Sequence, residues 1–160
     1  MKSQVLKKAS LVFALLLPCL GLTTIPENQK GLSQKIQQKD FTVLVNYANP
    51  LRGTQIYLTS EYDLKIRNDS AFAFLPYFGV AFSESYGGDG GIKFAEPMIN
   101  YSIKNKKKSD GWDIRFKVKA RESVYEISMD IYNNGSSTIS VNTFNRDMIT
   151  FLGEVNGTNK

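Results

Sequence analysis

The stretch WDIRFKVKARESVYEISMDIYNNG, residues 112–135, decides the fold, because its apolar and polar side chains alternate in two successive runs. Alternation with a period of two is typical of a β-strand that buries one face. The apolar positions are Trp112, Ile114, Phe116 and Val118 in the first run and Tyr125, Ile127, Met129 and Ile131 in the second. The Asn134-Gly135 pair that follows tolerates positive φ at both positions, so it predicts a tight hairpin.

The same alternation extends outward over most of the chain. Further alternating runs occupy residues 41–47, 56–66, 99–103, 139–143 and 148–155, and turn signals such as Asn49-Pro50 separate them. No segment has a helical pattern of comparable strength. The sequence therefore predicts an all-β domain over residues 41–155, a single antiparallel meander of about eight strands that forms a sandwich or a partly closed barrel.

Weaker signals flank this domain. Residues 23–40 are polar, with Leu32 and Ile36 at helical spacing, which predicts a linker or one short helix. Residues 156–160 are short and polar, and we expect a disordered tail there.

Residues 71–82 differ from the other strand candidates because both of their faces are apolar. Phe72, Phe74, Phe78, Val80 and Phe82 share one parity, and the other holds Ala71, Ala73, Leu75, Tyr77 and Ala81. We expect such a strand to be covered on both sides or to lie against a ligand. Pro76 lacks an amide donor and Gly79 lacks a side chain, so a bend or bulge is expected between them.

The first 22 residues have the pattern of a secretory signal peptide. Lys2, Lys7 and Lys8 precede an uninterrupted apolar run at residues 9–17. This run is too short to cross a bilayer, which takes roughly 20 apolar residues. We therefore expect an exported protein of the periplasm or the cell envelope.

Cys19 lies directly after this apolar run and has two interpretations. It is either the lipid-attachment residue of a lipoprotein, which would associate the chain peripherally with a membrane, or a residue removed with the signal peptide. Pro18 occupies the position before the cysteine, where lipoprotein signals usually have a small residue, while small residues follow at Gly21 and Thr23. Cleavage near residues 21–24 is therefore favoured over lipid attachment.

Composition excludes several classes of function. The chain has 20 Lys and Arg against 15 Asp and Glu, and losing three lysines with the signal peptide leaves a net charge of +2. So small a charge does not indicate a nucleic acid partner. The chain has no histidine, and Cys19 is its only cysteine, which argues against thiol catalysis, Cys/His zinc sites and an internal disulfide. We predict no catalytic residue, no metal and no cofactor.

The most informative local feature is the glycine-rich run YGGDGG at residues 86–91. Four glycines imply positive φ or a close approach of the backbone to another group. Asp89 alone supplies too few ligands for calcium, and the Gly-Lys-Ser/Thr sequence of a phosphate loop is missing. The run is either a tight structural loop or a binding site, and in the second case Tyr77, Tyr86 and Asp89 are the candidate residues.

Two basic features have ordinary structural explanations. Lys104 and residues 106–108 crowd an expected hairpin tip, where lysines discourage edge pairing, although such a tip could also contact anionic lipid headgroups. Arg146 lies between Asn145 and Asp147 and is expected to pair locally within its turn.

Three stretches together resemble a known family. They are LPYFG at residues 75–79, YGGDGGIKF at residues 86–94 and NRDMITFLG at residues 145–153. The chain resembles a family of short exported Bacteroidetes proteins that is known only as domain of unknown function forty-two fifty-one, over about residues 41–155. The resemblance implies a β-rich fold and an envelope location in a Gram-negative host. It implies no activity.

The expected function is that of a non-enzymatic envelope module that binds a small apolar or amphipathic ligand or a protein partner. This expectation rests on the doubly apolar segment, an aromatic content of 12% and the lack of recognisable catalytic groups. The alternative is a hydrolase of envelope polysaccharide, which would need two carboxyl groups about 5 to 9.5 Å apart in a concave site. The sequence leaves the oligomeric state open.

Overall fold

The computed structural model describes residues 27–82, 90–106, 110–121 and 123–157, with side chains from residue 31 onward. The signal-peptide segment, Cys19, Tyr86 and Asp89 lie outside these residues. The elements in chain order are α1 (Glu27–Gln37), β1 (Asp40–Pro50), β2 (Ile56–Arg67), β3 (Ser70–Leu75), β4 (Ile92–Asn105), β5 (Gly111–Lys119), β6 (Val124–Tyr132), β7 (Ser136–Thr143) and β8 (Arg146–Val155).

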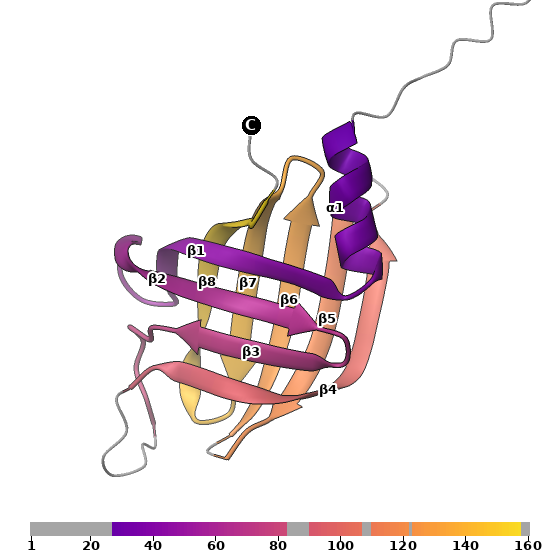
Figure 1. The fold of residues 1–160 in the computed structure, drawn as a ribbon. Coiled ribbons are helices and arrows are strands. Elements are labelled where there is room, and N and C mark those ends of the chain that lie inside the picture. The colour runs from indigo at the N-terminus through magenta and orange to yellow at the C-terminus, as the bar shows by residue number, and fades with distance from the viewer. Residues whose placement is uncertain (1–26, 83–89, 107–109, 122, 158–160) are drawn as a thin grey trace, which may run out of the picture.

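The eight strands form one closed antiparallel barrel (Figure 1). Each strand pairs with the next along the chain, and β8 pairs with β1, which closes the sheet. The predicted all-β meander is confirmed, and of the two forms left open the barrel is the one adopted. The predicted hairpin at Asn134-Gly135 joins β6 to β7, with a φ of 86° at Gly135 and its amide donating to the Tyr132 carbonyl oxygen at 2.8 Å.

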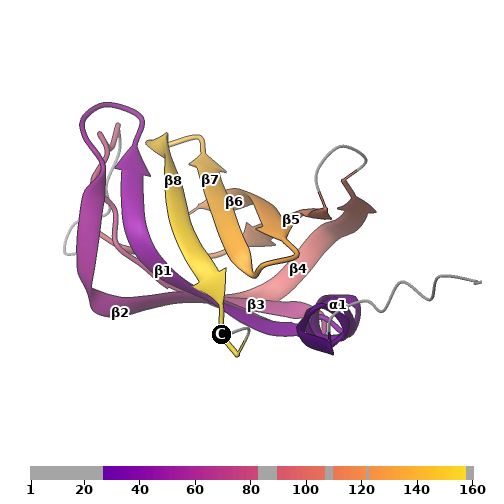
Figure 2. The ribbon, with the colours of Figure 1, turned by 90° about the horizontal axis from the view of Figure 1, so that it is seen from above.

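The barrel is flattened into a front layer and a back layer, and two bent strands connect these layers. Strands β1–β4 cross in front of β5–β8 in Figure 1, and Figure 2 gives the same arrangement seen from above. The register shifts between Val45 and Tyr47 in β1 and between Ile99 and Ser102 in β4, the strands that connect the front to the back. Bulges of this kind bend a strand sharply. Asn100, inside the β4 irregularity, has a φ of 56°, which asparagine tolerates better than most residues.

The core fills the interior of the barrel. Alternate side chains of every strand point inward, and many are fully buried, among them Leu64, Ile114, Met129, Ile131 and Phe151, each 0% exposed. A side chain that lined an open cavity would be accessible to a water molecule. These side chains are not accessible, so they pack against one another. Around them the barrel interior is a packed core.

Helix α1 covers one end of the barrel. Leu32 and Ile36 lie four residues apart, hence on one face of the helix, and both are buried in the core. The helix ends at Gln37, and a left-handed residue follows it at Lys39, with a φ of 53° and an amide that donates to the Ile36 carbonyl oxygen at 3.1 Å. No helix within the described residues is long and apolar enough to cross a membrane.

The opposite end, here called the loop end, is formed by the connections β1–β2, β3–β4, β5–β6 and β7–β8, because antiparallel order brings alternate connections to the same end. In Figure 1 this end lies away from α1. It carries described parts of the three stretches on which the family resemblance rests: LPYFG begins at the last residue of β3, Gly90 and Gly91 precede β4, and Asn145 precedes β8.

The structure corrects the prediction for residues 71–82. Regular pairing stops at Leu75, and beyond it only Ala81 makes a β-bridge, to Arg146. Pro76 accounts for the end of the strand because it has no amide to donate. There is therefore no long bent strand in this segment.

Of the two surroundings expected for this segment, cover on both faces by the protein itself is also wrong, while contact with a ligand stays a prediction. Ala71, Ala73 and Leu75 face the core, but the opposite side is open among the described residues: Phe72 and Phe74 on β3 and Phe78, Val80 and Phe82 in the loop are all exposed. A row of apolar side chains therefore lies on the outside of the barrel.

Candidate functional site

The described residues offer little for catalysis or metal binding. They contain no group of three His, Cys, Asp or Glu side chains arranged to hold a metal ion. Several strand carboxylates are engaged in exposed ion pairs, such as Asp63 with Lys65 at 2.8 Å and Asp113 with Arg115 at 2.9 Å. The candidates that remain are a clasp at the loop end, an apolar patch on the front and a groove on the back.

The clasp joins Tyr77 to Arg146 and thereby brings the three family-like stretches together. The Tyr77 hydroxyl lies 3.0 Å from the Val80 carbonyl oxygen and 2.9 Å from that of Asp147, within reach of either as a donor. Arg146 is buried, at 6% exposure, with its guanidinium carbon 5.1 Å from the centre of the Tyr77 ring. Its Nη1 atom donates to the carbonyl oxygens of Gly90 at 3.0 Å and Gly91 at 3.3 Å.

Backbone hydrogen bonds complete the clasp. The Phe82 amide donates to the Asn145 carbonyl oxygen at 2.8 Å, and the Asp147 amide donates to the Val80 carbonyl oxygen at 2.9 Å. Arg146 was expected to pair locally within its turn, but its guanidinium also bonds to carbonyl oxygens 56 and 55 residues away. The cause is the barrel itself, which puts the start of β8 beside the β3–β4 loop.

Glycines fit the clasp closely. Gly90 has a φ of 71°, and a β-carbon added at Gly91 would lie 3.0 Å from the Leu75 carbonyl oxygen. Both properties agree with the expectation that glycines here provide close approach or positive φ. The clasp thus anchors both ends of the connection that contains the glycine-rich run. Of the three predicted site residues, Tyr77 lies in this clasp, while Tyr86 and Asp89 fall outside the described residues.

The front patch is a group of exposed apolar side chains on β1–β3 and the two adjacent loops. Its members are Leu44, Tyr47, Leu51, Tyr57, Phe72, Phe74, Phe78, Val80 and Phe82. Phe74 is 46% exposed and Phe82 is 64% exposed, although both are large aromatic residues. Exposed apolar side chains gathered on one side of a protein are typical of an interaction site. The Asp63–Lys65 ion pair on β2 lies between Leu44 on β1 and Phe74 on β3, so the patch also contains charge.

Strand register brings members of the front patch together. Tyr47 faces Tyr57 across β1 and β2, with ring centres 5.3 Å apart in an edge-on arrangement. Phe74 stacks on Tyr62 at 5.5 Å and carries the Lys93 ammonium 4.9 Å from its ring centre. These rings are held in place by neighbours and remain accessible on one side, as preformed contact surfaces are.

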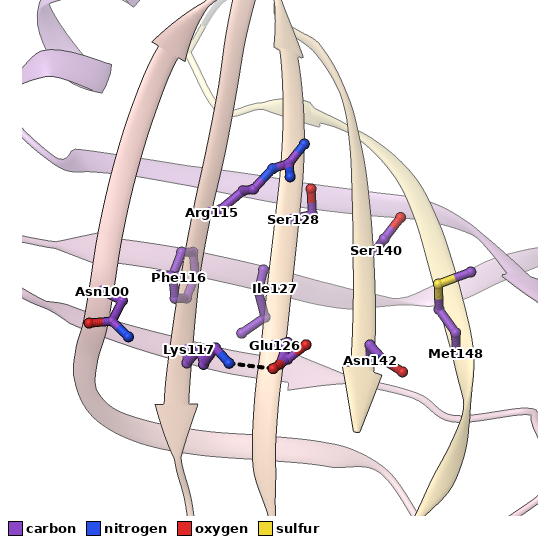
Figure 3. Close-up of a pocket in the computed structure, with 10 residues that line it drawn as sticks. All are labelled: Asn100, Arg115, Phe116, Lys117, Glu126, Ile127, Ser128, Ser140, Asn142 and Met148. Atoms are coloured by element: carbon purple, nitrogen blue, oxygen red, sulfur yellow. Dashed lines mark hydrogen bonds and ion pairs between the residues drawn. The ribbon is translucent and has the colours of Figure 1, made fainter. Parts of the chain in front are cut away.

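The back groove lies on the outer face of β5–β8, between β4 and β8 (Figure 3). Its volume is about 310 Å³. Seven of its ten lining residues have hydroxyl, amide or charged groups, although carbon atoms form most of the exposed wall. The lining comprises Asn100, Arg115, Phe116, Lys117, Glu126, Ile127, Ser128, Ser140, Asn142 and Met148. A second hollow of about 390 Å³ adjoins it and shares Glu126 and Asn142, with Val124, Thr143 and Phe144 completing the wall.

Charges in the groove are paired within the protein. Lys117 Nζ donates to Glu126 Oε1 at 2.5 Å, the contact dashed in Figure 3. This bond, with the positive charge of Lys117, lowers the pKa of the Glu126 carboxyl below its ordinary value, and a hydrogen bond from Asn142 acts in the same direction. Arg115 meets Asp113 with two parallel hydrogen bonds of 2.9 Å each.

Replacing Lys117 by methionine is expected to raise the pKa of Glu126 towards its ordinary value, because the main cause of the lowered pKa is removed. Since the pKa is lowered in the folded state, the pair stabilises the protein above the unfolded pKa, and this stabilisation is lost as the pH falls through the folded pKa. The measurement is a carboxyl-detected NMR titration of Glu126. Lys119→Met is the control, and an equal shift in that variant would contradict the assignment.

Sequence reasoning missed the groove and Arg146. Lys117, Glu126 and Asn142 are outward positions of three separate strands, and only the register makes them neighbours: Lys117 faces Glu126, which faces Asn142. The Asn134-Gly135 turn contained part of the signal, because a short hairpin fixes the pairing of its strands. Three residues, 133–135, join β6 to β7.

Comparisons with known proteins agree with this fold. A family described as "Domain of unknown function (DUF4251)" matches residues 25–155. The comparison with curated proteins gave no match. A crystal structure of a DUF4251 family protein from Bacteroides eggerthii DSM 20697 is similar, with a TM-score of 0.62, 16% sequence identity, and coverage of 80% of this chain and 86% of that chain. At this identity the likeness supports the fold alone.

Proposed function

Because the chain belongs to the DUF4251 family, for which only an unknown function is described, we propose its function from geometry: a non-enzymatic envelope module whose front patch binds a partner protein. The observation that carries this proposal is the exposure of Phe74, Phe82 and their neighbours on one side of the barrel. When a partner removes apolar side chains of this size from water, their burial stabilises the complex. The envelope location rests on the signal-peptide pattern of the first 22 residues.

A ligand inside the barrel has less support than a partner outside it. The interior side chains are packed against one another, and helix α1 adds Leu32 and Ile36 to that core. A ligand would have to displace these side chains, which costs free energy in a close-packed interior. The apolar surface available for binding is on the outside.

A protein partner fits the front patch better than a lipid surface does. The members of the patch lie on the loops, as Leu51 and Phe82 do, and also on the outer faces of the strands, as Leu44 and Phe72 do. A flat bilayer would reach the tips, whereas a protein can follow the side of the barrel. Six of its nine members are Tyr or Phe in strands or loops that the barrel supports, and aromatic residues are enriched in protein interfaces.

The alternative of a carboxylate hydrolase lacks comparable support. Asp113 and Asp130 lie opposite each other across β5 and β6 and are a pair of neighbouring carboxylates on this sheet. Each carboxylate already forms an ion pair, however, Asp113 with Arg115 at 2.9 Å and Asp130 with Lys106 at 2.7 Å. Neither lines the groove. We therefore do not carry this function further.

Photo-crosslinking in cells tests the proposal. A benzophenone amino acid placed at Phe74 or Phe82 is expected to form an adduct with one envelope protein, because both positions lie in the front patch. Ile103 is the matched control, an exposed apolar residue on β4 near its far end. Adducts with lipid alone, adducts with a second copy of the chain, or equal labelling from Ile103 would each contradict the proposal.

A further inference from the structure

The back groove contains an ordered array of hydrogen-bonding groups that the front patch does not use. One row crosses four strands, since Arg115 faces Ser128, Ser128 faces Ser140 and Ser140 faces Thr150. Adjacent strands lie about 4.8 Å apart, so these groups recur at short, regular steps across the sheet. The parallel row contains Lys117, Glu126 and Asn142, and Figure 3 shows both rows on the same face of the sheet.

The pairing of charges indicates which ligand the groove suits. Glu126 is held by Lys117 and Asn142, and Arg115 is held by Asp113, so each lining charge already has a counter-charge from this chain. A charged ligand would compete with these ion pairs. A neutral ligand with many hydroxyl groups would not, because carboxylate, amide and guanidinium groups have further lone pairs or N–H groups to share.

The adjoining hollow adds an aromatic surface. Phe144, in the turn between β7 and β8, is 80% exposed and stands beside Asn142 and Glu126 in the wall of this hollow. A nearly free aromatic ring next to planar hydrogen-bonding side chains is the arrangement that receives a sugar ring, whose C–H face packs on the aromatic face while its hydroxyls reach the polar groups. Val124 and Met148 extend the apolar surface at the two sides.

We propose that the back groove binds a neutral oligosaccharide. One sugar ring lies on Phe144 and makes hydrogen bonds to Glu126 and Asn142, and the chain continues along Ser128 and Ser140. The volume of about 310 Å³, with the adjoining 390 Å³, lies in the range of small-ligand sites. This site is on the opposite side of the barrel from the front patch, so the two binding events are independent.

Binding to a glycan array tests the proposal, using the mature full-length chain and an array that contains neutral, acidic and sulfated oligosaccharides. Neutral oligosaccharides are expected to bind, and calorimetry then gives the affinity for the strongest of them. Phe144→Ala and Asn142→Ala are each expected to weaken it about tenfold or more, through loss of the stacking surface and of a shared hydrogen bond. Phe82→Ala is the matched control, with an exposed Phe on the front, and should leave the affinity unchanged.

Binding to the Glu126→Gln variant distinguishes a neutral ligand from a cationic one. The amide keeps the hydrogen-bonding geometry without the charge, so neutral-sugar binding is expected to persist within about threefold, whereas binding of an amine would be lost. Binding of acidic glycans only, binding of peptides in place of glycans, no binding on the array, or equal weakening by Phe82→Ala would each overturn the proposal. The crosslinking result at Phe74 is independent of all these outcomes.

Discussion

Replacing Gly153 by alanine is expected to destabilise the protein by about 3 kcal/mol or more, which is a large part of the stability of a domain of this size. An added β-carbon would lie 2.0 Å from the Leu44 carbonyl oxygen and 2.9 Å from the Leu44 carbonyl carbon. Both are backbone atoms of β1 at the seam where β8 closes the barrel. Relief therefore requires β1 and β8 to separate at this point, because no flexible side chain is available to move.

Equilibrium urea unfolding measures this effect, and Gly31→Ala is the control. Gly31 lies in helix α1 with nothing within 4 Å of the added β-carbon. Alanine there is expected to stabilise the protein by up to about 1 kcal/mol, because alanine favours helix and restricts the unfolded chain. If Gly153→Ala unfolded at the same urea concentration as the parent, the close contact between β8 and β1 would be wrong.

Barrel closure itself was only partly predictable from sequence. The alternation of residues such as Ile114, Phe116 and Ile127 reveals which face of each strand is buried, since a one-residue slip would expose the whole set. It does not reveal whether the first strand meets the last. That pairing depends on Val45 facing Gly153, more than one hundred residues apart, where a glycine admits the bulge in β1. A sandwich and a barrel have the same local pattern.

The doubly apolar segment was misread for a related reason. Ala71 and Phe72 look alike to a rule that assigns buried faces by hydrophobicity, and a strand with two apolar faces is usually covered on both. The structure buries Ala71 and leaves Phe72 exposed, so the outer face of β3 is a surface rather than a second core. Hydrophobicity indicates that a side chain avoids water but not whether this chain or a partner covers it.

The candidate site residues also fall into two groups, those that sequence reasoning could find and those that it could not. Tyr77 was accessible to sequence reasoning because it lies beside the glycine-rich run along the chain. Arg146, Glu126 and Asn142 were not, since each meets its neighbours only through strand register or barrel closure. A site whose residues come from one loop can be predicted from sequence. A site assembled across strands can be predicted only once the strand pairing is known.

The clasp leads to the second large prediction: Arg146→Ala is expected to cost about 2 to 4 kcal/mol of stability. The substitution removes the hydrogen bonds to Gly90 and Gly91 and the contact with the Tyr77 ring, in a place where the side chain is buried. Hydrogen bonds to a charged group contribute about 1.5 to 3 kcal/mol, and carbonyl groups left unpaired in a buried site add to the loss. Arg121→Ala, at an exposed arginine of the same end, is the control and is expected to change stability by less than about 0.5 kcal/mol.

Hydrogen exchange distinguishes loss of the clasp from general destabilisation. Without Arg146 the β3–β4 loop loses its attachment to β8, so the amides of Phe82 and Asp147, which bond across that contact, are expected to exchange faster than those of β6. Arg146→Lys keeps the charge but offers one compact ammonium group instead of a planar guanidinium, so it should recover only part of the protection. Uniform acceleration across β6 and the loop would show general destabilisation, and full recovery with lysine would show that Arg146 acts through its charge. Either result would contradict its role as the link between β8 and the glycine-rich connection.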